Sequence, residues 1–281
     1  MPEVSCVVPT HGRDDLLTEA VASIAAQRSA PAELIVTDDL GSPVTRVLVE
    51  RWAVDLPFPV RYVDASGTGW RSAGASRNAG AALATGDLMA FLDDDDVWEP
   101  EYLTSLIAAL GAGTCDFAVG WTEADAGGGV YHIARMKAGL QVADVVARNP
   151  GFVGSNFVMT RDAFVRLGGF DPALTVANDK DLLVRALQHG LRYTVVPQVL
   201  VRNRIHTGPQ LTDKTERRVR GIETYMAKHS PLLSGQDRRY FRAQISSIRR
   251  VTGQTRLARW RSTAALARDR ATFNLVDAVK R

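Results

Sequence analysis

The sequence predicts an α/β fold with a mostly parallel, doubly wound (Rossmann-like) sheet and a helical appendage at the C-terminus. Over the first hundred residues, short β-branched runs alternate with amphipathic stretches, and this alternation is typical of parallel βαβ units. Residues 211–281 lack strand signals and are rich in arginine. We therefore expect one α/β domain over 1–210, made of halves 1–100 and 101–210, and a basic helical region over 211–281.

The first half is expected to contain four strands joined by three helices. The helix after the first strand places Leu17, Val21 and Ile24 on one face at helical spacing. Turn-forming residues close the second strand. The expected strands span 4–8, 33–37, 60–63 and 88–92, and the expected helices span 14–27, 45–52 and 73–84.

The second half is expected to contain further strands and an amphipathic helix. That helix would begin at Asn178 or Asp179, either of which is a good N-cap, and would end before Gly190. A glycine turn at 127–129 would join two antiparallel strands. The expected strands span 115–121, 130–134 and 154–160, with a shorter helix from 162.

Composition predicts a cytoplasmic globular protein. The chain has 281 residues, 46% of them hydrophobic, which is enough for one sizeable core. The net charge of +3 is too small to indicate a nucleic-acid partner. Cys6 and Cys115 have no metal-binding spacing, and no disulfide framework is implied. We also find no leader sequence and no run of about 20 apolar residues that could span a membrane.

Polar clusters follow the expected strands, where parallel sheets bind their ligands. The most unusual is Asp93 to Asp96, because four adjacent carboxylates repel one another. A divalent cation commonly offsets such repulsion, and Mg²⁺ or Mn²⁺ binds through carboxylates together with substrate phosphates. The alternative is a solvated turn in which Asp96 caps the next helix. Neither a complete G-x-G-x-x-G pattern nor a Walker loop is present, so a metal at these aspartates together with arginines would have to hold any phosphate.

Four of these motifs together resemble family 2 glycosyltransferases of the GT-A fold. They are VSCVVPTHGR at 4–13, LIVTDD at 34–39, ASRNAG with ATGD within 75–87, and FLDDDD at 91–96. The resemblance covers about residues 4–210. It implies an inverting enzyme that uses a nucleotide-sugar donor, most often a UDP-sugar, together with Mg²⁺ or Mn²⁺.

The resemblance also implies roles for single residues. It assigns Pro9, His11 and Asp39 to the nucleobase pocket, although many relatives have Tyr or Phe with Asn in place of His11 and Gly12. Asp96 is left as a helix cap. The remaining donor-site residues are Arg13, Arg71 and Arg77, with Asp93 and Asp94 on the ribose and sugar and Asp95 on the metal.

A second group of motifs supplies the expected catalytic base. The GGFD segment at 168–171 and the acid that opens the next helix are similar to the family's Gly-Gly-Phe-Asp and Glu-Asp motifs. Asp179 matches the general base, whereas Asn178 departs from the first acid of that pair. An inverting transfer needs a carboxylate beside the acceptor hydroxyl, and the metal stabilises the departing diphosphate. The alternative for Asp179 is a helix cap alone.

Arg204 and His206 lie in a segment similar to the family's Arg-x-His loop, which closes over the diphosphate. Either residue could contact phosphate, and His206 could bind the metal. The alternative is a purely structural histidine.

The basic helices of 211–281 have two interpretations. They pack on the catalytic domain or form a homodimer, or else they make peripheral contact with an anionic membrane, which would suit a lipid-linked acceptor. We favour the first. The alternatives to a lipid-linked acceptor are a glycan and a small molecule.

Two rival functions remain open. Residues 93–97 fit the D-x-D-x-[TV] pattern of haloacid-dehalogenase-like phosphatases, and Asn178 suggests a nucleotide-sugar-binding protein that has lost catalysis.

Overall fold

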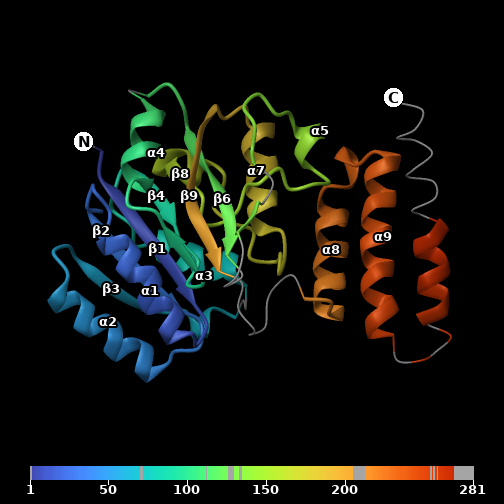
Figure 1. The fold of residues 1–281 in the computed structure, drawn as a ribbon, viewed down its shortest axis with the longest axis horizontal. Coiled ribbons are helices and arrows are strands. Elements are labelled where there is room, and N and C mark those ends of the chain that lie inside the picture. The colour runs from blue at the N-terminus through green and yellow to red at the C-terminus, as the bar shows by residue number, and fades with distance from the viewer. Residues whose placement is uncertain are drawn as a thin grey trace.

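A nine-stranded sheet forms the centre of the molecule, and helices cover both of its faces (Figure 1). The strand order is β3-β2-β1-β4-β8-β6-β9-β5, and β7 pairs with β6. The structure is a computed structural model that describes residues 2–69, 72–111, 113–125, 130–132, 135–204, 213–253, 255, 257 and 259–268.

The strands confirm the expected α/β pattern. Six of the nine described strands, β1 to β4, β6 and β9, run in the same direction, while β5, β7 and β8 run against them. The sheet is therefore mostly parallel, as predicted. The strands are β1 Val4–Thr10, β2 Glu33–Asp38, β3 Val60–Asp64, β4 Leu88–Phe91, β5 Asp96–Trp98, β6 Phe117–Asp125, β7 Val130–His132, β8 Phe157–Thr160 and β9 Tyr193–Arg204.

The helices connect these strands and then continue beyond the sheet. Residues 259–268 form a further helical segment beside α9 (Figure 1). The helices are α1 Asp14–Ala25, α2 Pro43–Asp55, α3 Ala73–Ala81, α4 Tyr102–Leu110, α5 Val142–Val145, α6 Arg161–Arg166, α7 Asn178–Gln188, α8 Glu216–Lys228 and α9 Gly235–Thr252, with 3-10 turns η1 Ser66–Thr68 and η2 Ser230–Leu232.

Side chains alternate across the sheet and so build two hydrophobic cores. In β1, Cys6 and Val8 point toward the core shared with α1 and α4, whereas Val7 points toward the core shared with α6 and α7. Because successive strand residues face opposite sides, β1 is buried on both of its faces.

Helices α8 and α9 extend the second of these cores. Val219 and Tyr225 of α8 and Phe241 of α9 belong to the same buried cluster as Leu182 and Leu183 of α7. The basic helices thus pack on the α/β domain, in agreement with the first interpretation. The expected boundary at 210 lies outside the described residues.

Several expected boundaries were wrong, and the helix starts matter most. Asp96 does not cap a helix, because it lies in β5, and α4 begins at Tyr102. Neither Asn178 nor Asp179 caps α7, since the N-cap is Ala177 and no side chain caps that end. Local sequence favours caps at these positions, but Ser155 binds the Asp96 side chain, Arg77 binds that of Asn178, and Asp179 accepts the amide of the next residue.

The predicted end of α7 is confirmed. Gly190 has φ +69, and the amides of Gly190 and Leu191 donate to the carbonyls of Leu187 and Ala186. These two hydrogen bonds form a Schellman motif. The glycine turn at 127–129 lies outside the described residues, although β7 does pair antiparallel with β6.

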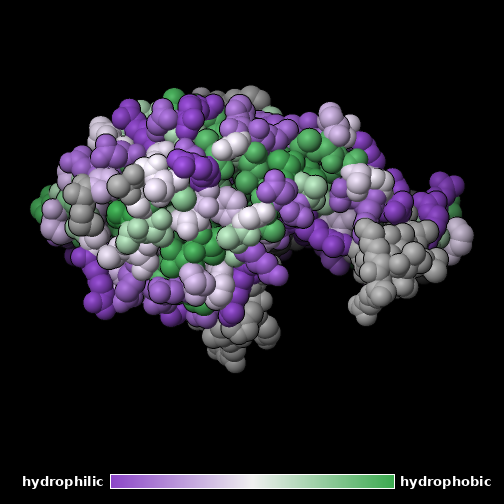
Figure 2. All heavy atoms as spheres, turned by 90° about the horizontal axis from the view of Figure 1, so that it is seen from above, coloured by the Kyte–Doolittle hydropathy of each residue, from purple (hydrophilic) through white to green (hydrophobic). Residues whose placement is uncertain are grey.

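The length and polarity of the described helices determine whether one of them could span a membrane. No helix within the described ranges is both long and apolar enough to cross a membrane. On the face drawn in Figure 2, hydrophobic patches are interspersed with hydrophilic residues.

We expect Gly80→Ala to lower the free energy of unfolding by about 1–2 kcal/mol, measured by urea denaturation. A Cβ at Gly80 would lie 2.5 Å from Val7 Cγ1 and 2.9 Å from Thr37 Cγ2, so α3 would be pushed off the sheet. Gly67→Ala is the matched control, because a Cβ there meets nothing within 4 Å. Equal stability of the two variants would contradict the close packing of α3.

Candidate active site

The carboxyl ends of β1, β2 and β4 meet at one rim, as the parallel sheet predicts. His11, just after β1, has Nδ1 2.5 Å from Asp39 Oδ1, just after β2. The His11 side chain is 65% exposed, so one face of its ring is open to a ligand. Pro9 is buried beside Thr37 in the same two strands. The structure therefore brings the three expected nucleobase residues together.

Asp94 faces the protein and not the open rim. Its carboxylate accepts hydrogen bonds from Thr10 Oγ1 at 2.7 Å, from the His11 amide at 3.4 Å and from Arg13 Nε at 3.2 Å. Burial raises the pKa of Asp94 to about 6, although Arg13 counteracts this. The expected contact of Asp94 with ribose or sugar is therefore not supported, because the side chain is fully buried and occupied by these donors.

Asp93, Asp95 and Asp96 form a cluster suited to a cation. One carboxylate oxygen from each lies within 4.8 Å of the others. Ser155 Oγ donates to Asp96 at 2.5 Å, and Arg13 Nη1 lies 2.8 Å from Asp95. Burial raises the pKa of Asp96 well above its usual range, and the charges of Asp93 and Asp95 add to this. An all-oxygen set of this kind fits Mg²⁺ or Mn²⁺.

Arg204 holds the acidic loop from behind. Its guanidinium donates to the backbone carbonyls of Asp94, Asp95 and Leu16 at 2.9–3.0 Å, and it pairs with Glu19 at 2.5 Å. Because all three nitrogens are used in this way, the expected phosphate contact of Arg204 is not supported. Arg71 and His206 lie outside the described residues.

Arg77 connects the acidic loop to the start of α7. Its guanidinium pairs with Asp93, donates to Asn178 Oδ1 at 3.1 Å and stacks on the Phe170 ring, with 5.1 Å to the ring centroid. Gly154 leaves the space that this guanidinium occupies. Arg77 is only 3% exposed, so its guanidinium lies within the protein, where Asp93 and Asn178 bind it.

Asp179 lies one residue after this bridge, at the start of α7. Its Oδ1 accepts the Lys180 amide at 2.7 Å, and its side chain is half-buried. Burial raises the pKa of Asp179, while the Lys180 amide and the charge of Arg77 lower it. Ala177, two residues before Asp179, has a φ of +58°, which costs an alanine about 1 kcal/mol. Strained backbone of this kind often occurs at functional sites.

Two further residues in the first turn of α7, Lys180 and Asp181, were not predicted from the sequence to support the site. Asp181 is fully buried and binds Arg185 Nε, Lys228 Nζ and His229 Nε2 at 2.7–2.8 Å. Lys180 Nζ donates to the Ala147 carbonyl at 3.0 Å.

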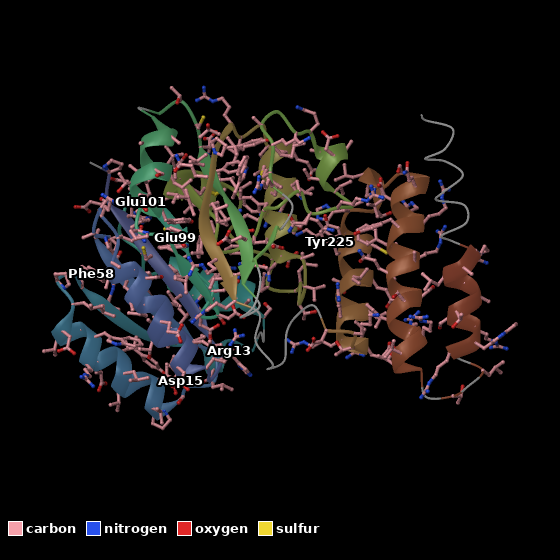
Figure 3. All side chains as sticks on the ribbon, in the orientation of Figure 1. Arg13, Asp15, Phe58, Glu99, Glu101 and Tyr225 are labelled. Atoms are coloured by element: carbon pink, nitrogen blue, oxygen red, sulfur yellow. The ribbon has the colours of Figure 1, made fainter. Side chains whose placement is uncertain are left out.

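Lys180 also lies over the aromatic rings of the C-terminal helices. Its Nζ is 4.2 Å from the centroid of Tyr225 in α8 and 4.8 Å from that of Phe241 in α9. Burial lowers the pKa of Lys180 to about 8. Figure 3 shows Tyr225 between α8 and the α/β domain, and Arg13 at the rim. The C-terminal helices thus hold the helix that carries Asp179.

Sequence comparisons match most of the chain. The model of "Glycosyl transferase family 2" matches residues 5–168, and that of "Glycosyl transferase family group 2" matches residues 88–270.

Curated relatives match parts of the chain. A validoxylamine A glucosyltransferase of Streptomyces hygroscopicus subsp. limoneus is 39% identical over 111 residues, which are 39% of this chain and 24% of that protein. Succinoglycan biosynthesis protein ExoO of Rhizobium meliloti is 30% identical over 213 residues, which are 70% of this chain and 59% of that protein. The chain thus spans about a quarter of the first relative and more than half of the second.

Solved structures with a similar fold cover nearly all of the chain. TarS 1-349 of S. aureus has a TM-score of 0.65 at 19% identity, over 95% of this chain and 79% of that one. Mannosyltransferase PcManGT from Pyrobaculum calidifontis, in complex with GDP-Man and Mn²⁺, has a TM-score of 0.65 at 20% identity, over 99% and 79%. At sequence identities this low, the similarity establishes only the fold. This structural similarity confirms the predicted GT-A fold.

We expect Asp181→Asn to lower the free energy of unfolding by about 2 kcal/mol at pH 7. Burial raises the pKa of Asp181, but the hydrogen bond from His229, the charge of Arg185 and the hydrogen bond from Lys228 outweigh it and hold the pKa at about 2, below the usual value near 4. The unfolded chain therefore binds more protons in this window, so the stabilisation is complete above pH about 4 and is lost as the pH falls toward 2.

Urea unfolding at a series of pH values tests this, with the exposed Asp162→Asn as control. The wild type and the control should lose stability more steeply than Asp181→Asn between pH 4 and 2. Parallel curves for all three proteins would contradict the prediction.

Proposed function

Because the chain belongs to glycosyltransferase family 2, we propose that it is an inverting, metal-dependent enzyme that transfers a sugar from a UDP-sugar to an acceptor hydroxyl. One observation carries the proposal. Arg77 joins Asp93, at the cation-binding loop, to Asn178, which precedes the candidate base Asp179. Donor activation and deprotonation of the acceptor would then take place on either side of one buried side chain.

The rim residues would bind the donor. The exposed His11 ring would stack on the base, with Asp39 and Pro9 completing the pocket, and Arg13 would lie nearest the diphosphate. Asp93 would contact the ribose or the sugar. Asp95, with Asp93 and Asp96 in reach, would hold Mg²⁺ or Mn²⁺. When bound, the ion would stabilise the negative charge of the departing diphosphate.

Asp179 would act as the general base. It would accept the proton of the acceptor hydroxyl as that oxygen attacks the anomeric carbon from the side opposite the diphosphate, which inverts the configuration. Its raised pKa suits this role, because a base is more effective when its pKa lies closer to the working pH.

Bound ligands in structural neighbours support the donor class. TarS 1-349 has been solved with UDP-GlcNAc, and PcManGT with GDP-Man and Mn²⁺. Family membership decides against the phosphatase alternative. A glycan, lipid-linked or small-molecule acceptor, peripheral membrane contact and a homodimer remain predictions. So does a cytoplasmic location, which the free thiols of Cys6 and Cys115 would suit.

We expect Asp95→Ala to abolish the Mn²⁺-dependent part of donor binding, because it removes a carboxylate from the cation cluster. A thermal-shift screen of UDP- and GDP-sugars with and without Mn²⁺ measures this, since a ligand of the native state raises its apparent stability. Asp55→Ala on the exposed side of α2 is the control. If no nucleotide-sugar stabilises the wild type, the donor assignment fails.

Asp179→Asn should reduce kcat about a hundredfold or more while donor affinity stays within about twofold. The amide keeps the size of the side chain and can still accept the Lys180 amide, but it cannot take the acceptor proton. Initial rates of sugar transfer and a donor titration measure the two effects, with Asp162→Asn as control.

Near-normal turnover by Asp179→Asn would remove Asp179 as the base. Donor binding by the wild type without transfer to any glycan, lipid-linked or small-molecule acceptor would instead favour the catalytically inactive binding protein.

A further inference from the structure

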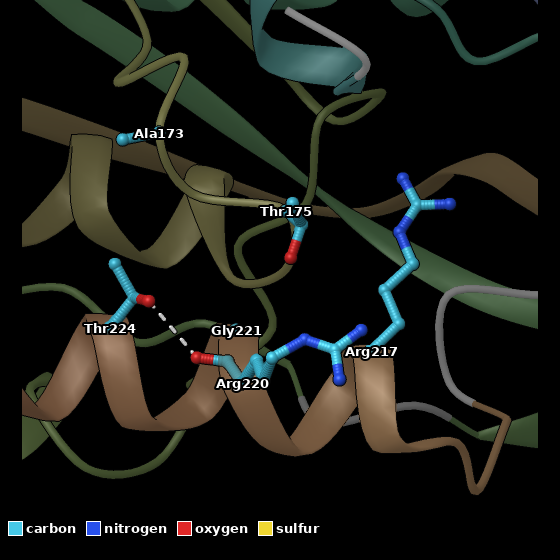
Figure 4. A pocket seen from close by; sticks show the side chains of 6 residues that line it. All are labelled: Ala173, Thr175, Arg217, Arg220, Gly221 and Thr224. Atoms are coloured by element: carbon cyan, nitrogen blue, oxygen red, sulfur yellow. Dashed lines mark hydrogen bonds between the residues drawn. The ribbon is translucent and has the colours of Figure 1, made fainter.

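A cavity of about 430 Å³ lies between α8 and the loop that leads into α7 (Figure 4). This volume is in the range of small-molecule sites. None of the site residues discussed above lines it. The described lining residues are Ala173 and Thr175 of the loop and Arg217, Arg220, Gly221 and Thr224 of α8.

The cavity is positively charged. Arg217, Arg220 and Thr224 follow at helical spacing on one face of α8. In Figure 4 the Arg220 side chain runs along α8 toward Arg217, whose side chain extends away from the helix, and Thr175 lies on the loop across from them. Among the described lining residues no side chain is acidic. The nearby Glu216 is engaged on the other side by Thr252 Oγ1 at 2.6 Å, and Asp171 pairs with Lys228 at 2.6 Å. Thr224 Oγ1 donates to the Arg220 carbonyl at 3.0 Å, so the polar groups that could meet a ligand are the two guanidiniums and the Thr175 hydroxyl. Two guanidiniums with a hydroxyl are typical of a site for a phosphoryl group.

The cavity is fixed next to the candidate base. A Cβ at Gly221 would lie 2.7 Å from Val176 Cγ2 and 2.8 Å from Thr175 Oγ1, so the loop packs directly on the α8 backbone there. Thr175 is four residues before Asp179. Ser72 Oγ, at the start of α3, donates to the Pro172 carbonyl at 3.1 Å and ties the same loop to the donor half. The loop that lines the cavity thus leads directly into the helix that carries Asp179.

We propose that this cavity binds a phosphoryl group of the acceptor, so that the enzyme glycosylates an acceptor that carries a phosphate. The inference rests on the proposed function, because it assumes that Asp179 receives an acceptor hydroxyl. Arg217 and Arg220 would hold the phosphoryl oxygens and Thr175 would donate a hydroxyl, while the acceptor's sugar ring extends toward Asp179. A soluble sugar phosphate and a lipid-linked sugar diphosphate share this chemistry.

Isothermal titration of the full chain with inorganic phosphate tests the site directly. The titration is made at low ionic strength with EDTA, which removes the metal from the donor site. Phosphate should bind the wild type, and Arg217→Ala/Arg220→Ala should weaken binding about tenfold or more. The matched control is Arg242→Ala/Arg250→Ala, which removes the same charge from exposed positions of α9 that do not line the cavity. Undetectable binding to the wild type, unchanged binding by the cavity variant or equal weakening by the control would overturn the proposal.

Transfer kinetics then test whether the phosphoryl group belongs to the acceptor. A hexose 6-phosphate, the same uncharged hexose and a polyprenyl-diphosphate-linked hexose serve as acceptors. The KM for whichever phosphorylated acceptor is used should rise about tenfold in the cavity variant, with kcat and the donor KM unchanged. A preference for the soluble or the lipid-linked compound identifies the source of the phosphate. Both proteins should use the uncharged hexose equally, because it has no phosphoryl group to bind. A rise in the donor KM alone, or the same wild-type KM for the phosphorylated and the uncharged hexose, would overturn the proposal.

The two levels of inference fail separately. If no nucleotide-sugar stabilises the wild type, the proposed function fails, whether or not inorganic phosphate binds to the cavity. If donor binding and transfer are normal but phosphate binding is insensitive to Arg217 and Arg220, only the acceptor subsite fails.

Discussion

The buried guanidinium of Arg77 is the interaction on which the site depends. A cation that is nearly excluded from water is tolerated only with charged and polar partners around it. Asp93, after β4, supplies the charge, Asn178 at the start of α7 supplies an oxygen, and the Phe170 ring covers one face. Because these partners come from separate parts of the chain, the donor loop and the candidate catalytic helix cannot move apart without exposing an unpaired charge.

The first turn of α7 distributes its side chains among different parts of the molecule. Successive helical residues are rotated by about 100°, so Asn178 turns to Arg77, Asp179 stays at the site, and Lys180 and Asp181 turn to the C-terminal helices. The ion pairs of Asp181 with α8 hold the helix in place against the strained backbone at Ala177. The region outside the main family motifs therefore supports the candidate base physically.

Sequence could predict the fold and the rim but not the partners of the individual carboxylates. The βαβ alternation and the parallel-sheet rule place His11, Asp39 and the Asp loop together. Asp94 and Asp96 look alike in the sequence, yet one is bound by Thr10, 84 residues away, and the other by Ser155, 59 residues away. Arg204 similarly supports a loop 109 residues earlier. Such roles depend on tertiary contacts, and no local pattern encodes them.

The charge balance of the acidic loop explains why a divalent cation fits it. Arg13 pairs with Asp94 and Asp95, and Arg77 pairs with Asp93, so two guanidiniums face four carboxylates. Arg204 contacts the loop through backbone carbonyls, and its nearest charge partner is Glu19. The raised pKa of Asp96 reflects the excess negative charge together with burial. Among the described side chains the acidic loop therefore carries more carboxylates than guanidiniums, and an ion of charge +2 between Asp93, Asp95 and Asp96 would reduce their mutual repulsion.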